Sequence, residues 1–328
     1  MTPTQPLSGP FERLTRAFGH HLPSAIVGEV EPLHQGRVST RRLREILPLC
    51  ACEVPRGLAN RARRRLRRVG RALGDVREID VSIGIVADLV QRERVESEAG
   101  ERLQRHLTDE RDERRERMLD QLSSVNTRKL ERDLADIARV LAMRQQTDGW
   151  AQLLAVRLES RAQRVRDAVV EAGALYISDR VHNVRIAAKK LRYALEVAGD
   201  TGEARTKRCV REVKSIQAVL GRLHDLEVLG HMIQDLIVPG PVDEPLNVGF
   251  ETLRRGLDRE CRELHSQYVG GRETLLKVCA SAVIHAGRIW SDRGGELSGA
   301  GPRLSTGRVL KMSLPTARPT IRTMAKRD

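Results

Sequence analysis

Residues 33–47 read LHQGRVSTRRLREIL, and residues 181–195 read VHNVRIAAKKLRYAL. A histidine, an arginine, a basic pair, a leucine and a further arginine recur in the same order, 148 residues apart. Two copies at this separation in a chain of 328 residues predict that the whole protein is a duplication.

A second internal match supports the duplication. Residues 71–81 read RALGDVREIDV, and residues 218–228 read AVLGRLHDLEV, at an offset of 147 residues. Two matches in the same order at nearly the same offset are hard to obtain by chance, and with the helical spacing of the apolar residues they predict an all-α protein. We expect two tandem antiparallel helical bundles related by pseudo-twofold symmetry.

The composition agrees with a helical and strongly basic protein. Apolar residues make up 40% of the chain, charged residues 31% and aromatic residues only 2%, which favours helices over strands. The formal net charge of +14 indicates a polyanionic partner. Nucleic acid is one such polyanion, but so few aromatic residues argue against single-strand binding, which relies on base stacking.

Hydrophobic spacing and turn residues divide the chain into four parts. We expect a flexible leader at 1–10, a first bundle repeat at 11–148, a second at 149–291 and a disordered basic tail at 292–328. In the first repeat, helices are predicted at 11–30, 32–51, 55–73, 76–92, 93–120 and 127–143, with a break at Gly74. In the second, they are predicted at 150–176, 207–220, 223–237, 246–268 and 272–290. The helix that carries the second motif is predicted to begin at its N-cap Ser178 and to end before a turn at 199–202.

The repeated stretch places cations on one side of a helix. Positions i, i+3, i+7 and i+10 share one face. The first copy therefore has a ladder of His34, Arg37, Arg41 and Arg44. The second copy has a ladder of His182, Arg185, Lys189 and Arg192. The opposite face of each helix is apolar, with Leu43, Ile46 and Leu47 in the first copy and Val184, Leu191, Ala194 and Leu195 in the second.

A solvated charged face is the alternative interpretation of these ladders. It predicts acidic residues three or four positions away from the cations. Acids occur only at the end of each ladder, where Glu45 and Glu196 can pair with Arg41 and Arg192. Like charges stacked in register in both copies favour a ligand-binding surface.

The residue types suit phosphate. Both histidines are expected in the first turn of a helix, where unpaired N–H groups and the helix dipole attract anions. Arginine offers a planar fork of donors, and lysine a mobile point charge. Because the cations recur about every 5.4 Å along the helix, a linear chain of phosphates matches them better than one small anion does.

These motifs resemble the CHAD domain, the conserved-histidine α-helical domain. The resemblance rests on H-x-x-R-V-x-x-R-R-L-R at 34–44, H-x-x-R-I-x-x-K-K-L-R-Y at 182–193, and the later L-G stretches. It implies two four-helix-bundle repeats whose basic helices line a central channel for inorganic polyphosphate, often at polyphosphate granules. The resemblance assigns polyphosphate contacts to His34, Arg37, Arg41, Arg42, Arg44, Arg67, His182, Arg185, Lys189, Lys190, Arg192 and Lys214.

No catalytic or metal-binding motif stands out. The five cysteines lack metal spacing and are interpreted as small core residues in a reducing cytoplasm. Neither a signal core nor a membrane-spanning run is found. We therefore expect a cytoplasmic, non-enzymatic protein without metal or cofactor. Two alternatives stay open: a nucleic-acid-binding protein that uses the helix around Arg61–Arg71 and the tail, and a phosphate-processing enzyme.

Overall fold

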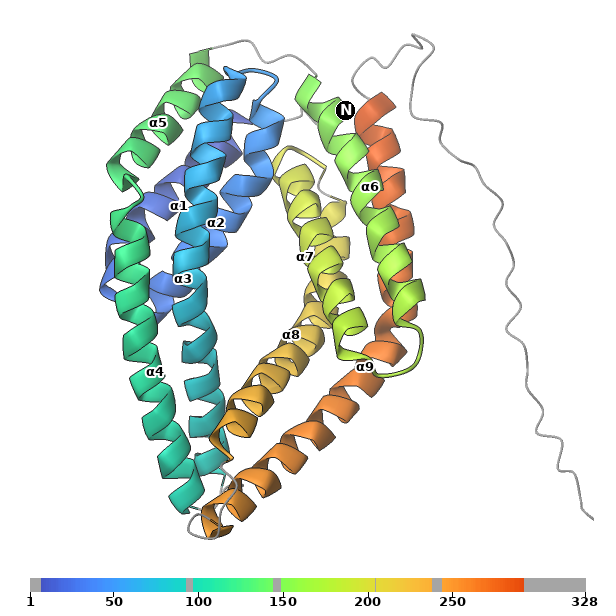
Figure 1. Ribbon diagram of the computed structural model, residues 1–328. Coiled ribbons are helices and arrows are strands. Elements are labelled where there is room, and N and C mark those ends of the chain that lie inside the picture. The colour runs from blue at the N-terminus through green and yellow to red at the C-terminus, as the bar shows by residue number, and fades with distance from the viewer. Residues whose placement is uncertain (1–6, 93–96, 144–148, 204, 238–243, 292–328) are drawn as a thin grey trace, which may run out of the picture. The chain divides into compact units, whose positions relative to one another are not determined.

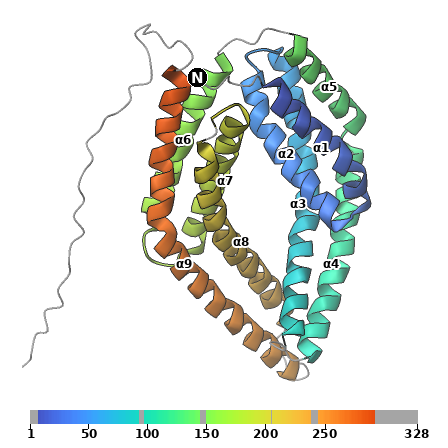
Figure 2. The same cartoon turned by 180° about the vertical axis from the view of Figure 1, so that it is seen from behind.

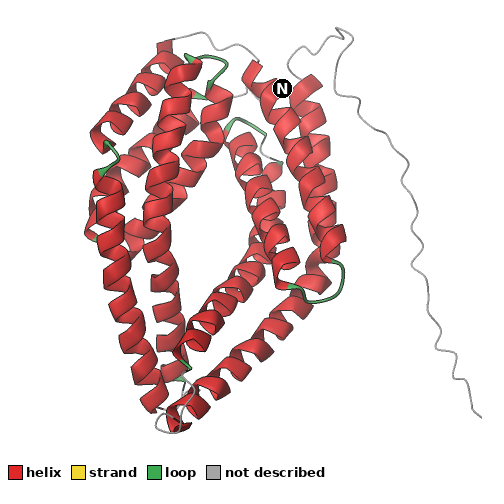
Figure 3. Ribbon diagram, viewed as in Figure 1, coloured by secondary structure: helices red, strands yellow, loops and turns green. Residues whose placement is uncertain are grey.

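The computed structural model describes residues 7–92, 97–143, 149–203, 205–237 and 244–291, all of them helices and short connections without a strand (Figure 3). The basic tail and most of the leader lie outside these residues. Nine helices occur in the described part of the chain. They are α1 (Ser8–Val27), α2 (Val30–Cys50), α3 (Arg56–Gln91), α4 (Ser97–Ser123), α5 (Thr127–Met143), α6 (Gly149–Ala172), α7 (Ser178–Asp200), α8 (Thr206–Leu236) and α9 (Glu244–Ser291).

Each half of the chain closes a ring of helix contacts. In the first half α1 packs on α2, α2 on α3, α3 on α4 and α5, and α5 back on α1 (Figure 1). In the second half α6 packs on α7, α7 on α8, α8 on α9, and α9 back on α6, which is an antiparallel four-helix bundle (Figure 2). The long helix α9 contacts α8 and α6, as α4 and α5 together contact α3 and α1 in the first half. The all-α bundle prediction is confirmed, and the twofold symmetry stays a prediction.

The two halves also share their hydrophobic cores. Helix α2 contacts α6 and α7, α3 contacts α8, and α4 contacts α9. The larger hydrophobic cluster takes buried side chains from both halves, among them Phe18 and Trp150. The smaller cluster joins Ile79 and Leu103 to Leu229 and Phe250. The two halves therefore share their cores, and the boundary between the repeats at residue 149 stays a prediction.

Three predicted helix breaks are wrong, because the chain continues as helix through Gly74, Gly221 and the pair at 270–271. A glycine inside a helix costs about 1 kcal/mol relative to alanine, which the tertiary contacts of these long helices outweigh. Gly271 packs close to Ile216, where an added Cβ would lie 3.6 Å from the Ile216 side chain. At the N-terminus, α1 begins at Ser8, inside the predicted leader, and Leu7 is fully buried.

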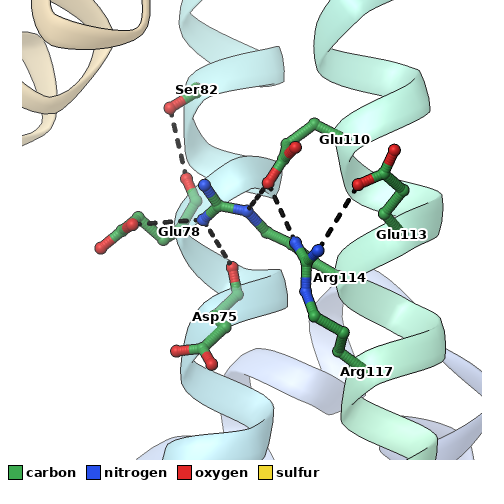
Figure 4. A network of polar contacts seen from close by, with 7 residues as sticks. All are labelled: Asp75, Glu78, Ser82, Glu110, Glu113, Arg114 and Arg117. Atoms are coloured by element: carbon green, nitrogen blue, oxygen red, sulfur yellow. Dashed lines mark hydrogen bonds and ion pairs between the residues drawn. The ribbon is translucent and has the colours of Figure 1, made fainter.

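The charge-rich helix α4 is tied to α3 by ion pairs (Figure 4). Arg114 reaches Glu110 at 2.7 Å on its own helix and Glu78 at 3.2 Å on α3. Arg111 Nε donates to the buried Asp80 carboxylate at 2.6 Å. The alternating acidic and basic residues of 93–120 predict a solvent-exposed, salt-bridged helix. The salt bridging is confirmed, but α4 is not solvent-exposed all round, since Leu103 and other side chains of this helix are buried.

The cysteines fit the predicted core role at four of five positions. Cys50, Cys209, Cys261 and Cys279 are buried free thiols, whereas Cys52 is exposed, so the core interpretation is wrong there. Burial raises the pKa of the Cys261 thiol to about 11. None of the described helices has the combination of length and apolar character that a membrane span requires.

Candidate functional site

The two cation ladders lie on α2 and α7, which contact each other across the two halves. The apolar positions of both repeated stretches are buried, including Leu43, Leu47, Leu191 and Leu195. The ladder cations therefore project from the other side of each helix, where their side chains are half-buried.

Arg37 and Arg41 of α2 and Arg185 and Lys189 of α7 form one cluster of like charges, which we call the central cluster. Burial, then Arg41, lowers the pKa of Arg37 to about 10, although Glu78 and Asp75 act in the other direction. Burial, then Arg185, Arg41 and Arg37, lowers the pKa of Lys189 to about 7. Both halves of the chain thus contribute cations to the same place.

Local packing explains how Arg37 reaches this position. The Arg37 guanidinium lies so close to Gly74 of α3 that a Cβ there would collide with it. The Arg37 carbonyl accepts hydrogen bonds from Thr40 Oγ1 at 2.8 Å and from Arg41 Nε at 3.4 Å. Gly36 is buried, and a Cβ there would be 3.4 Å from the side chains of Ala25 and Leu73. Helix α2 is continuous through Gly36, which allows its close packing on α1 and α3.

His34 and His182 are each the fifth residue of their helix, so their predicted place in the first turn is wrong. At that position the backbone N–H is already within the helical hydrogen bonding. Ser178 is likewise the first residue of α7 and not its N-cap, which is Ile177. The histidines contribute through their side chains and not through the helix end.

The histidine rings lie among cations. Burial, then Arg77, lowers the pKa of His34, and its buried Nδ1 makes no hydrogen bond within the described part of the chain. The ring centroids of His182 and His224 are 4.8 Å apart. Burial, then Arg185 and His182, lowers the pKa of His224 to about 4.

The residues that lie beside the first two members of each ladder come from equivalent positions of the second internal match, on α3 in the first half and on α8 in the second. In that match Arg77 aligns with His224, and Glu78 aligns with Asp225. Asp225 is 4.0 Å from Arg185, and burial raises its pKa. Sequence reasoning missed Arg77, His224 and Asp225 as site residues, although their aligned positions were the available signal.

Helix α3 extends the cationic surface beside Arg44. Burial, then Arg63, Arg67 and Arg71, lowers the pKa of Arg44, and its buried Nε makes no hydrogen bond to the residues that the structure describes. These three α3 arginines are exposed and four residues apart, on one face of the helix. Arg67 was predicted for the site; Arg63 and Arg71 were missed because only the packing of α2 on α3 places them there.

Four other predicted residues lie in different surroundings. Glu196 pairs with Arg192 at 2.9 Å, as predicted, and also with Arg42 at 3.2 Å. Arg192 also stacks on the ring of Tyr193, 4.6 Å from its centroid. Lys190 is exposed, and Lys214 lines a cavity together with Arg42.

The predicted pair of Glu45 with Arg41 is wrong. Glu45 instead pairs with two arginines of α6, Arg161 at 2.7 Å and Arg157 at 3.7 Å. Arg41 consequently stays in the central cluster without a carboxylate partner among the described residues.

The arrangement as a whole is suited to binding an anion. Half-buried cations with unpaired donors lie close together. Of the nearby carboxylates, Glu78 pairs with Arg114 outside the cluster, and Asp225 lies 4.0 Å from Arg185. Among the described residues no cluster of histidine, cysteine, aspartate or glutamate has the arrangement of a metal site. These features define an all-helical protein with a cluster of half-buried cations between its two halves.

Comparison with known proteins identifies the family. Residues 11–234 match the CHAD domain, and the chain belongs to this family. The crystal structure of the CHAD domain from the plant Ricinus communis has a TM-score of 0.55 and 20% identity, covering 86% of this chain and 93% of that one. PptA from Streptomyces chartreusis has a TM-score of 0.52 and 17% identity, covering 86% and 98%. At these identities the likeness establishes the fold. A comparison with curated proteins found no match.

Proposed function

We propose that this protein binds inorganic polyphosphate in the cationic site between its two halves and does not process it. The observation that carries the proposal is the central cluster. Arg37 and Arg41 from one half and Arg185 and Lys189 from the other are half-buried together. Burial, and then their mutual repulsion, lowers the pKa values of Arg37 and Lys189. Membership of the CHAD family, which is linked to polyphosphate, supports the same ligand.

The electrostatics favour a ligand of high negative charge. Crowded, half-buried cations destabilise the unbound protein, because burial disfavours charge and like charges repel. A bound polyanion removes both penalties and supplies acceptors for unpaired donors such as Arg44 Nε and Arg185 Nε. A single phosphate could neutralise only part of the cluster.

The length of the site favours a linear ligand. From His34 to Arg44 the first ladder covers ten residues, or about 15 Å of helix. Arg63, Arg67 and Arg71 of α3 run beside Arg44 and widen the same surface. A chain of phosphates can follow this row and engage several cations in succession. Retention at polyphosphate granules would follow from such binding.

Nucleic acid is the competing polyanion. The basic run on α3 is only partly available to it, because Arg65 is paired with Asp133 and Arg68 donates to Ser124 Oγ at 2.9 Å. The half-buried central cluster is also better suited to a thin phosphate chain than to a duplex, whose phosphates lie on a wide surface.

A combined substitution of both ladders tests the proposal. His34→Ala, His182→Ala, Arg37→Glu and Arg185→Glu together should abolish binding of labelled long-chain polyphosphate. A matched control carries Arg255→Glu and Arg262→Glu, two exposed arginines of α9, and should keep nearly all of the affinity. Circular dichroism checks that both variants are folded. Unchanged affinity of the ladder variant would show that the ladders are not the binding site.

The non-enzymatic part of the proposal has a separate test. Purified protein is incubated with short-chain polyphosphates, with and without Mg²⁺, and orthophosphate is measured over time. We expect no release above the buffer control. Release that disappears in the ladder variant would instead identify an enzyme.

A further inference from the structure

A cavity of about 540 Å³ lies between α1, α2, α7 and α8, and its lining differs in kind from the cation ladders. One part of the lining is apolar, with Leu14, Leu195, Val197 and Val210. A purely phosphate ligand cannot use such a surface. A cavity of this size and mixed lining is typical of sites for small organic ligands.

Three cations of α8 border this cavity. Lys207, Arg211 and Lys214 are exposed and follow one another at intervals of four and three residues, so they share one face of the helix. None of them forms an ion pair with a carboxylate in the described residues. They extend over about 10 Å of helix, the reach of a short row of phosphates.

The carboxylates of the cavity are not equivalent. Glu45 is held by Arg157 and Arg161, and Glu196 by Arg42 and Arg192. Asp200 differs from both. Its one ion pair within the described chain, with Arg13, measures 3.9 Å, too long for a hydrogen bond. Burial raises the pKa of Asp200, as expected for a carboxylate without a close cation. Asp200 is therefore available to accept hydrogen bonds from a ligand.

We propose that this cavity binds a purine nucleoside triphosphate, and that guanosine triphosphate (GTP) is its best-matched ligand. The base lies against the apolar lining, its N–H donors bond to the Asp200 carboxylate, and the triphosphate lies along Lys207, Arg211 and Lys214. Guanine offers two neighbouring N–H donors, which suit a carboxylate with two acceptor oxygens. This site is distinct from the central cluster and does not depend on polyphosphate being the ligand there.

Other ligand classes match fewer of these features. A bare phosphate chain has neither an apolar part nor an N–H donor, so it would leave the apolar lining unused and would be repelled by Asp200. A fatty acid would fill the apolar part, but it carries one charge for three cations and has no donor for Asp200. Only a ligand with an apolar ring, N–H donors and several negative charges uses the whole lining.

Calorimetric titration of the full chain with GTP tests the proposal. We expect one GTP per chain, bound at least tenfold more tightly than inorganic tripolyphosphate in the same cavity. Combined Lys207→Ala, Arg211→Ala and Lys214→Ala should weaken GTP binding at least tenfold. The matched control, with Arg255→Ala, Arg262→Ala and Lys277→Ala on exposed positions of α9, should change it less than twofold.

Two further variants separate this site from the ladders. Asp200→Asn should weaken GTP about tenfold without weakening tripolyphosphate, because only the nucleotide donates to this carboxylate and a bare phosphate chain is repelled by it. Arg37→Ala with Lys189→Ala should leave GTP binding unchanged. No GTP binding at millimolar concentration would overturn the proposal. So would GTP binding that is lost with the ladder cations, or that tripolyphosphate competes for equally well.

Discussion

Lys189→Met should stabilise the unbound protein and weaken its binding of polyphosphate. Lys189 is half-buried beside Arg185, Arg41 and Arg37, and its pKa is lowered from 10.5 to about 7. At about 1.36 kcal/mol per pKa unit this corresponds to an upper limit of about 5 kcal/mol against the charged form. Solvent screening at a half-buried site reduces the expected gain in unfolding free energy to about 1–3 kcal/mol at pH 7.

The gain should depend on pH in a defined direction. The folded-state pKa of Lys189 lies below the unfolded value, so the cost of charging it is fully present below about pH 7. The cost fades as the pH rises toward 10.5, because the folded protein then holds a neutral amine and the unfolded chain also loses its proton. The difference between wild type and Lys189→Met should therefore be largest near pH 6–7 and small near pH 10.

Urea unfolding followed by circular dichroism at several pH values measures the stability, and fluorescence anisotropy with labelled polyphosphate measures the affinity. We expect affinity to fall at least tenfold, since one charge-assisted contact is worth about 1.5–3 kcal/mol. Lys190→Met, at the exposed neighbouring position, is the control for stability and should leave it unchanged. A loss of stability in Lys189→Met, or an unchanged affinity, would refute this reasoning about the central cluster.

Three further predictions address pH, packing and a buried ion pair. Polyphosphate affinity should fall as the pH rises from 6 to 9, because Lys189, whose pKa in the unbound protein is about 7, must take up a proton on binding. Anisotropy titrations that show the same affinity over this pH range would contradict the prediction. Gly74→Ala should weaken polyphosphate binding about threefold to tenfold, because the added methyl group displaces Arg37. At the control position Gly84 the added methyl group meets open space. Gly84→Ala should therefore leave the affinity unchanged and stabilise the helix by up to about 1 kcal/mol. Asp80→Ala should lower the unfolding free energy by about 3 kcal/mol, because Arg111 loses its buried partner. The folded variant should bind polyphosphate as the wild type does. A stability change below 1 kcal/mol in urea unfolding would show that the pair contributes little.

The sequence predicted the helices well and their ends less well. Apolar spacing located most of the described helices, because a helix that buries one face carries that period in its sequence. Helix α4 was located instead by its alternating charges. The predicted break at Gly74 is wrong because a glycine can serve a close tertiary approach without ending the helix. The break at Gly221 is also wrong, although an added Cβ there would meet open space. At Gly74 the neighbour is the Arg37 guanidinium, which lies 37 positions earlier in the chain. No local pattern contains that information.

The candidate site was predicted in part for the same reason. Helical spacing put Arg37 with Arg41 and Arg185 with Lys189, but it could not show that the two pairs form one cluster across the halves. It also could not show that Glu196 holds both Arg192 on its own helix and Arg42 on another. Ion pairs between helices depend on which helices pack together, and a single helical period does not determine that.

Competition between polyanions tests the proposed function most directly. Labelled long-chain polyphosphate is bound to the full chain, and unlabelled polyphosphate, duplex DNA or RNA is added at equal phosphate concentration and fixed salt. We predict that only unlabelled polyphosphate displaces the label at equal concentration, and that DNA or RNA leaves most of it bound even in excess. Displacement by DNA or RNA at equal phosphate concentration would contradict the proposal and identify a general polyanion-binding or nucleic-acid-binding protein.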